Sequence, residues 1–372
     1  MTTFTPVDSA HMARALQLAA RGLYSAHPNP MVGCVVVAGD EVVGEGWHER
    51  AGEEHAEINA LREAGAAATG ATVYVTLEPC AHHGKTPPCA EALVEAGVAR
   101  VIAAMEDPYS EVAGRGLEHL RNAGIETAVG LMESAAAALN EGFISRVKHG
   151  RPFVRLKVAT SIDGATAMAS GESQWITGPA ARHDVQKLRA RSGAVITGIG
   201  TVLADDPSLN VRDERIDTHG VQPLRVVLDT RLRMPLAATM LTLPGKTLVC
   251  CIEGNDSSEL EAAGAEVVEV GTYVQESFDG ERVNVFEVLA VLAERGVNDV
   301  LVEAGPRLAG YLVEKDLVDE LVIYQAPHIM GSNTREMFTT PAWQVLGDRK
   351  SLDIVDVRRV GSDMKITARP ID

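Results

Sequence analysis

The feature that most constrains how this chain can fold is a helix stop near the middle of its 372 residues. The alanine-rich stretch Met132–Lys148 is predicted to be helical and ends at His149-Gly150, and the following Arg151-Pro152 cannot continue a helix. A chain of this length exceeds what one hydrophobic core usually supports. We therefore predict two domains, residues 1–150 and residues 151–372, each able to bury its own core.

Apolar runs and helical stretches alternate through the first half. Helical patterns follow His55, Pro87 and Gly114, and the apolar runs have the length and composition of buried strands. The strand candidates are Met31–Ala38, Ala71–Leu77 and Arg100–Ala104. This order predicts an α/β/α sandwich.

The second half repeats the alternation and is predicted to be another α/β domain. A helix is expected after Asn284, with one apolar face docked on a sheet. That face carries Phe286, Leu289, Ala290 and Ala293. The strand candidates are Phe153–Thr160, Leu224–Asp229, Thr247–Ile252, Val300–Glu303 and Glu320–Ala326.

The composition, 46% hydrophobic and 23% charged, is that of a soluble globular protein. No window approaches the roughly 18 consecutive apolar residues of a membrane span, and the N-terminus lacks the pattern of a signal peptide. The net charge of −17 would repel a phosphate backbone, which disfavours a nucleic-acid partner. We expect a cytoplasmic protein that binds neither membrane nor nucleic acid.

Five cysteines are an odd number for a disulfide framework, which favours metal binding, catalysis or core packing. Cys34, Cys250 and Cys251 stand in apolar strand candidates and are expected to be small buried residues. Cys80 and Cys89 therefore remain as the candidates for metal binding or catalysis.

A histidine and these two cysteines carry the strongest chemical signal. His55 and Glu57, separated by one residue, are followed by Cys80 and then by Cys89, the elements by which zinc deaminases hold one metal ion. Zinc with three protein ligands keeps a fourth position for water and lowers the pKa of that water to roughly 7. We predict His55, Cys80 and Cys89 as the ligands of one Zn²⁺ per chain.

Glu57 is the candidate catalytic residue, because a carboxylate that is not a ligand can carry protons between the water and the leaving ammonia. Its place two residues after His55 turns it away from the ligand nitrogen but keeps it near the same water. The alternative is a closed structural zinc site, with His82 or His83 as fourth ligand and Glu57 on the helix surface.

The spacing of the two cysteines departs from the common deaminase motif. Two residues usually separate them, whereas eight separate Cys80 from Cys89. The run 79–89, together with His27-Pro28-Asn29-Pro30, resembles the deaminase domain of the bifunctional deaminase-reductase family of riboflavin biosynthesis. The resemblance implies a cytidine-deaminase-like fold. It also implies that Asn29, His48 and Lys85 line the substrate pocket, Asn29 at the base and the other two at the phosphoribosyl end.

Glycine-rich turns in the second half are ambiguous when taken alone. Gly198-Ile199-Gly200 begins like a dinucleotide fingerprint, but Leu203 stands where the third glycine belongs, so a Rossmann assignment fails. The turn 303–310 follows an apolar strand and opens a helix, which is the geometry that offers backbone N–H groups to a phosphate. It is equally consistent with an ordinary strand-to-helix connection.

Longer runs in this half resemble the reductase domain of the same family. They are Leu156–Gly164, Ser170–Thr177 and Thr201–Pro207. The resemblance implies a dihydrofolate-reductase-like fold that binds NADPH. The residues implied to contact NADPH are Ala159, Trp175, Thr201, Asp205, Thr230, Gly305, Pro306, Arg307, Leu308, Ala309 and Gly310. Those implied to face the substrate are Lys157, Ser173, Arg189, Leu209, Arg212 and Glu303.

Several of these residues also have an ordinary explanation. Arg189 and Arg212 are suitable phosphate partners, although arginines on helices are more often solvated. Lys157 could polarise or protonate the reacting sugar, or it could be a surface lysine. Arg307 is larger than the residue expected at its position.

The resemblance implies two reactions in sequence. The first is zinc-dependent hydrolytic deamination of 2,5-diamino-6-(5-phosphoribosylamino)pyrimidin-4-one. The second is NADPH-dependent reduction of the ribosyl group to ribityl, giving 5-amino-6-(5-phosphoribitylamino)uracil. A homo-oligomer that binds a small pyrimidine ribosyl phosphate is expected.

Two other functions would share parts of the sequence pattern. A nucleic-acid adenosine deaminase would share the ligands and Glu57, but it should show a basic groove, which the acidic charge opposes. A non-catalytic zinc scaffold that binds a nucleotide would share the ligands but consume no NADPH.

Overall fold

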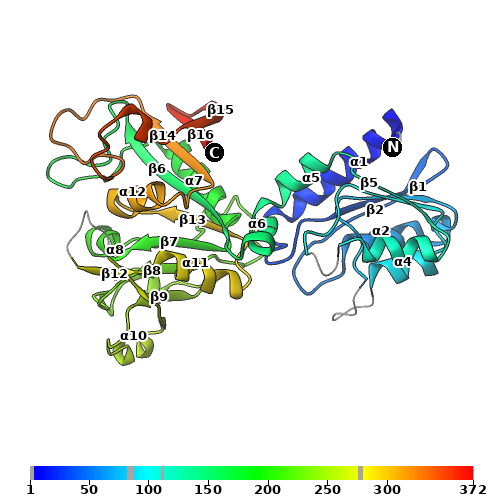
Figure 1. Ribbon diagram of the computed structural model, residues 1–372, viewed down its shortest axis with the longest axis horizontal. Coiled ribbons are helices and arrows are strands. Elements are labelled where there is room, and N and C mark those ends of the chain that lie inside the picture. The colour runs from blue at the N-terminus through cyan, green and yellow to red at the C-terminus, as the bar shows by residue number, and fades with distance from the viewer. Residues whose placement is uncertain (1–3, 82–87, 110–112, 275–279, 372) are drawn as a thin grey trace. The chain divides into compact units, whose positions relative to one another are not determined.

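The computed structural model of the chain describes residues 4–81, 88–109, 113–274 and 280–371. It divides into two compact units, unit 1 from Met1 to Gly150 and unit 2 from Arg151 to Asp372 (Figure 1). Each unit has its own sheets and its own clusters of buried side chains, so each is described by itself.

Unit 1 is built on a five-stranded sheet in the order β2-β1-β3-β4-β5. Strand β1 runs antiparallel to β2 and β3, whereas β3, β4 and β5 are parallel. The strands are β1 (Gly33–Ala38), β2 (Glu41–Trp47), β3 (Thr72–Val75), β4 (Arg100–Ala103) and β5 (Glu126–Val129). The sequence pattern missed β2 and β5, whose residues are partly exposed and therefore lack a continuous apolar run.

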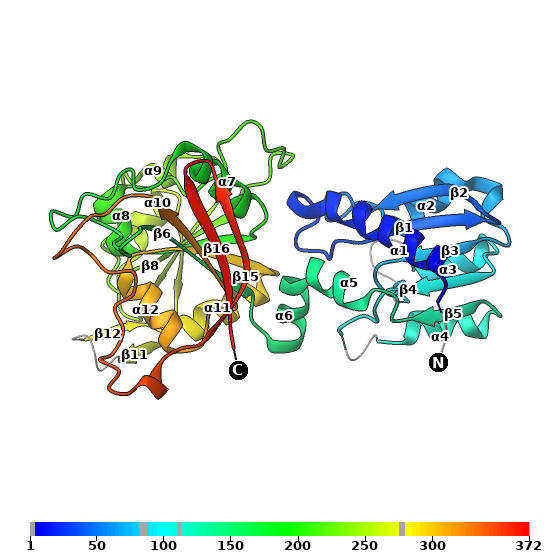
Figure 2. The same cartoon turned by 90° about the horizontal axis from the view of Figure 1, so that it is seen from above.

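Helices cover both faces of this sheet (Figures 1 and 2). Cys34 and Val36 of β1 lie in a core cluster with α2, α3 and α4, whereas Val35 and Val37 lie in another with α1 and α5. The helices are α1 (Pro6–Ala19), α2 (Ala56–Ala64), α3 (Cys89–Glu95), α4 (Arg115–Asn122), α5 (Glu133–Leu139) and α6 (Glu141–His149). The predicted α/β/α sandwich is confirmed.

The stretch Met132–Lys148 is helical as predicted, but Asn140 divides it into two helices, α5 and α6. The buried Asn140 side chain accepts a hydrogen bond from the backbone N–H of Met31 at 2.8 Å and donates one to the carbonyl of Met31 at 2.9 Å. An asparagine that bonds backbone in this way competes with helical hydrogen bonding. Gly150, at φ 65°, ends α6 where the helix stop was predicted.

Unit 2 is built on a nine-stranded sheet in the order β10-β9-β8-β7-β13-β6-β14-β16-β15, with a separate β11-β12 hairpin. The strands from β10 to β14 in this order are parallel, and β16 and β15 continue antiparallel. The strands are β6 (Phe153–Ser161), β7 (Ala194–Gly198), β8 (Leu224–Leu228), β9 (Thr247–Cys251), β10 (Glu266–Glu269), β11 (Thr272–Val274), β12 (Glu281–Val283), β13 (Asp299–Glu303), β14 (Glu320–Ala326), β15 (Leu352–Val360) and β16 (Asp363–Pro370).

Two layers of helices sandwich the parallel part of this sheet. Val300 and Val302 of β13 pack in a cluster with α11 and α12, and Leu301 packs in the opposite cluster with α7 and α8. The helices are α7 (Pro179–Ala190), α8 (Ile199–Asp205), α9 (Thr239–Thr242), α10 (Ser258–Ala262), α11 (Val285–Glu294) and α12 (Pro306–Glu314).

The apolar face predicted for the helix after Asn284 is only half right. Leu289 and Ala293 are buried, but Phe286 is 48% exposed and Ala290 is also exposed. The residues of α11 that pack inward are Val285, Val288, Leu289, Leu292 and Ala293. The prediction that Cys34, Cys250 and Cys251 are buried strand residues is confirmed.

The two units have separate cores, which generates a prediction about folding. A fragment comprising residues 151–372 should unfold in one cooperative transition, because its core clusters lie wholly within unit 2. The measurement is denaturant unfolding followed by circular dichroism. An insoluble fragment, or one without a cooperative transition, would contradict independent folding of unit 2.

Candidate active sites

Three side chains from separate elements of unit 1 form a potential metal site. His55 is the N-cap of α2, Cys89 is the first residue of α3, and Cys80 follows strand β3. Their ligand atoms all lie within 4.8 Å of one another. The Nδ1 atom of His55 is 3.2 Å from the Sγ atom of Cys89 and 3.7 Å from that of Cys80. The sequence-predicted ligands are therefore brought together.

The chemistry of this donor set fits zinc. One imidazole and two thiolates are the nitrogen and sulfur ligands that zinc prefers, and three of them leave one position open. A hydrogen bond from Cys89 and one from His55 lower the pKa of the Cys80 thiol to about 4, although burial opposes this shift. The backbone N–H of Cys89, at the start of α3, also donates to Cys80 Sγ at 3.3 Å.

Glu57 lies beside this group in the first turn of α2 and is 3% exposed. Burial, and then the charge of Cys80, raise the pKa of the Glu57 carboxyl to about 7, although His55 opposes the shift. This burial argues against the closed-site alternative in its stated form, which placed Glu57 on the helix surface. His82, His83 and Lys85 lie outside the described residues.

Asn29 and His48 form a hydrogen-bonded pair next to His55. His48 Nδ1 lies 3.1 Å from the carbonyl oxygen of Glu54, so this nitrogen must donate. Burial lowers the pKa of His48 to about 4, and the neutral ring then accepts from Asn29 Nδ2 at 3.0 Å through Nε2. His48, which is 3% exposed, thus fixes the amide of Asn29, and its expected place at the phosphoribosyl end of the substrate stays a prediction.

Unit 2 contains a pocket of about 1200 Å³ at the carboxyl edge of its parallel strands. Gly198, Leu228 and Glu303, which end β7, β8 and β13, all line it. Ligands bind at this edge in open α/β sheets. Although the chain carries a net charge of −17, many arginines line the pocket. They are Arg182, Arg189, Arg212, Arg231, Arg233, Arg282, Arg307 and Arg335. Such a lining suits a phosphate-bearing ligand.

Most residues implied to bind NADPH or substrate do line this pocket. They are Ala159, Trp175, Thr201, Asp205, Thr230, Gly305, Pro306, Arg307 and Leu308 for NADPH, and Lys157, Ser173, Arg189, Leu209, Arg212 and Glu303 for the substrate. Ala309 and Gly310 do not line it: Ala309 is 1% exposed, and a Cβ on Gly310 would lie 2.0 Å from the carbonyl oxygen of Thr339. These two residues serve close packing of α12.

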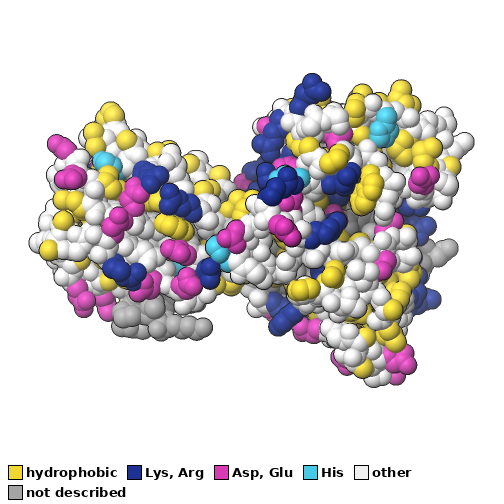
Figure 3. Space-filling view, turned by 180° about the vertical axis from the view of Figure 1, so that it is seen from behind, with side chains coloured by type: hydrophobic (Ala, Val, Ile, Leu, Met, Phe, Trp, Pro, Cys, Tyr) yellow, Lys and Arg dark blue, Asp and Glu magenta, His cyan; other side chains and the backbone are white. Residues whose placement is uncertain are grey.

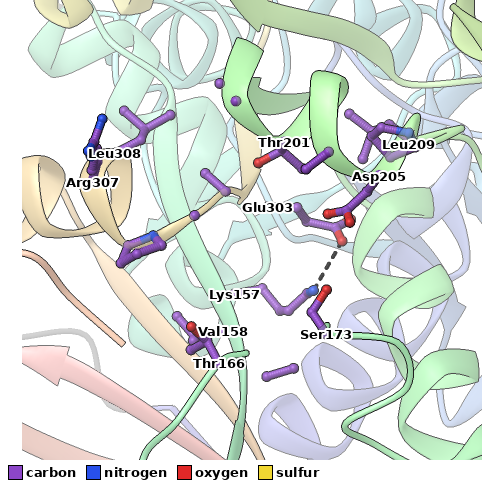
Figure 4. A pocket seen from close by; sticks show the side chains of 18 of the residues that line it. Lys157, Val158, Thr166, Ser173, Thr201, Asp205, Leu209, Glu303, Arg307 and Leu308 are labelled. Atoms are coloured by element: carbon purple, nitrogen blue, oxygen red, sulfur yellow. Dashed lines mark ion pairs between the residues drawn. The ribbon is translucent and has the colours of Figure 1, made fainter. Parts of the chain in front are cut away.

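Three residues that line the pocket form an ion-pair cluster, of which Figure 4 shows the Lys157–Glu303 pair. Glu303 is 3.1 Å from Lys157 Nζ and receives two hydrogen bonds from Arg189, at 2.5 and 3.1 Å. Burial alone would raise the pKa of Glu303, but the charges of Arg189 and Lys157 outweigh burial and lower it. Lys157 is 16% exposed in its side chain, so it is not a surface lysine.

The sequence patterns missed several residues that line the same pocket. Arg231 and Arg233 follow Thr230 at the end of β8, and Tyr273 and Arg282 come from the β11-β12 hairpin. The signal for the first pair was the polar sequence directly after an apolar strand. No local signal marks the hairpin, because its approach to the pocket depends on tertiary packing of Tyr273 against Tyr311.

Basic side chains are interspersed with acidic ones on the faces of the two units shown in Figure 3. Among the described residues, no helix combines the length and apolar character needed to cross a bilayer.

These features define a class of protein: a zinc deaminase joined in one chain to a dinucleotide-dependent reductase. Two family models match accordingly. Residues 5–105 match the cytidine and deoxycytidylate deaminase zinc-binding region, and residues 152–366 match the RibD C-terminal domain.

Full-length relatives match as well. The riboflavin biosynthesis protein RibD of Escherichia coli is 48% identical over 96% of this chain and 98% of its own length. The protein of that name from Bacillus amyloliquefaciens is 40% identical over 98% of this chain and 97% of its own length.

Two solved structures are similar to this chain over almost its whole length. Acinetobacter baumannii RibD superposes with a TM-score of 0.91, at 47% identity over 98% of this chain and 99% of that chain. The Thermotoga maritima diaminohydroxyphosphoribosylaminopyrimidine deaminase/5-amino-6-(5-phosphoribosylamino)uracil reductase superposes with a TM-score of 0.84, at 32% identity and the same coverage. The chain belongs to the RibD family, the bifunctional zinc-dependent deaminases and NADPH-dependent reductases of riboflavin biosynthesis.

The ligand assignment generates a prediction about metal content. Cys80→Ser should reduce zinc from about one ion per chain to near zero and lower the denaturation midpoint of unit 1, because metal-binding free energy is also folding free energy. Elemental analysis after gel filtration measures the zinc. Cys250→Ser is the matched control, a buried cysteine outside the site that should keep its zinc. Stoichiometric zinc in Cys80→Ser would exclude Cys80 as a ligand.

Proposed function

We propose that unit 1 deaminates 2,5-diamino-6-(5-phosphoribosylamino)pyrimidin-4-one and that unit 2 reduces the ribosyl group of the product with NADPH. The observation that carries the first assignment is the buried Glu57 beside three convergent zinc ligands. The second rests on the arginine-rich pocket that surrounds the Lys157–Glu303–Arg189 cluster.

In the deaminase site, His55, Cys80 and Cys89 would hold the zinc ion. Zinc supplies a water of lowered pKa at its open position. Glu57, with a pKa raised to about 7, can accept a proton from that water and deliver it to the departing amino group. A carboxyl group whose pKa lies near the working pH is suited to both transfers.

Asn29 supplies the base-recognition element in this proposal. Because its Nδ2 atom is committed to His48, its carbonyl oxygen is left to accept a hydrogen bond from the pyrimidine. His48 then acts through Asn29 by holding the amide in one orientation. We keep Lys85 as the candidate contact to the substrate phosphate.

In the reductase site, NADPH would, when bound, provide the hydride for the ring-opened sugar carbon. Glu303 holds the Lys157 amine inside the pocket, near Ser173 (Figure 4), where it can donate a proton to the sugar oxygen. Arg212 presents a guanidinium to the same pocket and is the candidate for the substrate phosphate. The sugar carbon thus accepts the hydride, and the sugar oxygen accepts the proton from Lys157.

Residues at the carboxyl edge of the strands would hold the dinucleotide. Thr201 and Asp205 come from α8, Thr230 follows β8, and the turn 305–308 opens α12. Backbone N–H groups at the start of a helix suit a diphosphate. Arg307 projects from this turn, so its large side chain is accommodated outside the packed core.

The expected homo-oligomer and cytoplasmic location stay predictions. The surface that best supports an oligomer is β15, which is the last strand of the nine-stranded sheet. Its apolar side chains Ile354, Val355 and Val357 are 62%, 49% and 53% exposed. Apolar edge strands of this kind invite pairing with another chain. Acidic residues precede basic ones along the strand, so two antiparallel copies would match in charge.

The role of Glu57 is tested by a variant that removes the negative charge and keeps the shape of the side chain. Glu57→Gln should reduce ammonia release by at least about 100-fold, because the amide cannot carry protons, while zinc stays near one per chain. Ammonia release and zinc content are measured on the same preparation. Loss of zinc would identify Glu57 as a ligand, contrary to its assigned role.

The role of Lys157 is tested in the other unit. Lys157→Met should reduce NADPH oxidation by about 100-fold, because it removes the proton donor but leaves Glu303 paired with Arg189. Ammonia release should be unchanged in Lys157→Met, and NADPH oxidation with the deaminated intermediate should be unchanged in Glu57→Gln. A variant that loses both activities while remaining folded would contradict two separate sites.

A further inference from the structure

Glu78 is a buried carboxylate two residues before the zinc ligand Cys80 and is 4% exposed. No step proposed above uses it. Its two oxygens accept four backbone hydrogen bonds. Oε2 accepts from the N–H of Asp107 at 3.1 Å and of Gly114 at 2.9 Å, and Oε1 accepts from the N–H of Gly116 at 2.8 Å and of Leu117 at 3.3 Å.

These bonds replace the missing cap of α4. Gly114, the N-cap residue of α4, has a φ of 80° and no side chain to cap the helix. Glu78, 38 residues before Gly116, supplies the acceptor instead. A carboxylate in this position is also stabilised by the positive end of the helix dipole.

The cap joins α4 to the segment that carries the zinc ligand. A Cβ added to Gly116 would lie 1.9 Å from the carbonyl oxygen of Pro79, so the first turn of α4 packs directly on the peptide before Cys80. On the other side, the first turn of α3 holds Cys80, because Ala90 N–H donates to its carbonyl at 3.1 Å and Cys89 N–H donates to its sulfur at 3.3 Å. Cys80 is thereby fixed between two helix N-termini.

We propose that Glu78 is a positioning residue of the deaminase site, which holds Cys80 in place for zinc by tying its segment to α4. This inference rests on the proposed zinc site. Groups that orient metal ligands typically change metal affinity by 10–100-fold when they are replaced. A cap that served only the stability of α4 would leave zinc affinity almost unchanged.

The experiment measures zinc affinity by chelator competition for the wild-type chain, Glu78→Gln, Glu78→Asp and Thr5→Ala. Both Glu78 variants should bind zinc about 10–100-fold more weakly, because an amide or a shorter carboxylate cannot accept all four N–H groups. Thr5→Ala removes the capping box of α1 in the same unit, so it lowers stability without touching the site and should change zinc affinity less than about two-fold. Glu78→Asp serves if Glu78→Gln does not fold.

Amide hydrogen exchange of the zinc-free chain gives a second measurement. The N–H groups of Gly116 and Leu117 should exchange faster in the Glu78 variants than in the wild type. Faster exchange with unchanged zinc affinity would overturn the positioning role and leave Glu78 as a helix cap. Equal losses of zinc affinity in Thr5→Ala and the Glu78 variants would overturn it as well. Weak zinc binding by the wild-type chain, matched by Cys80→Ser, would instead contradict the zinc site itself.

Discussion

The convergence of one nitrogen and two sulfur atoms within 4.8 Å is the constraint on which the first unit depends. His55, Cys80 and Cys89 are brought together only if α2, the segment after β3 and the start of α3 meet at one edge of the sheet. Much of the surrounding structure serves this meeting. For example, a Cβ on Gly46 would lie 2.3 Å from the carbonyl oxygen of Ala56, so β2 lies close against the first turn of α2.

The two active sites use buried carboxylates in opposite ways. Burial, and then the charge of Cys80, raise the pKa of Glu57 to about 7, which suits a group that must gain and lose a proton. Glu303 contacts Arg189 and Lys157, whose charges lower its pKa, so it remains an anion. The first carboxylate is suited to move protons, and the second is suited to hold a lysine in place.

The sequence identified the zinc ligands and Glu57, because these assignments depend on residue type and short spacing. His55, Glu57, Cys80 and Cys89 were found because few residues bind zinc and their order is distinctive. The cytidine-deaminase-like and reductase folds followed from the resemblance and are confirmed by the comparisons.

The interactions missed by the sequence analysis join distant segments. Asn140 bonds Met31 across 109 residues, and Arg189 bonds Glu303 across 114. Local periodicity contains no information about such pairs, which is why the break between α5 and α6 was not predicted. The neutral state of His48 likewise depends on burial, which only the folded chain reveals.

The central claim is that one chain performs two reactions in a fixed order at separate sites. A time course of ammonia release and NADPH oxidation with the diamino substrate tests it most directly. Ammonia release should proceed at the same rate with and without NADPH, and NADPH oxidation should begin after a lag while the deaminated intermediate accumulates. NADPH oxidation that precedes ammonia release, or ammonia release that requires NADPH, would contradict two separate and ordered sites.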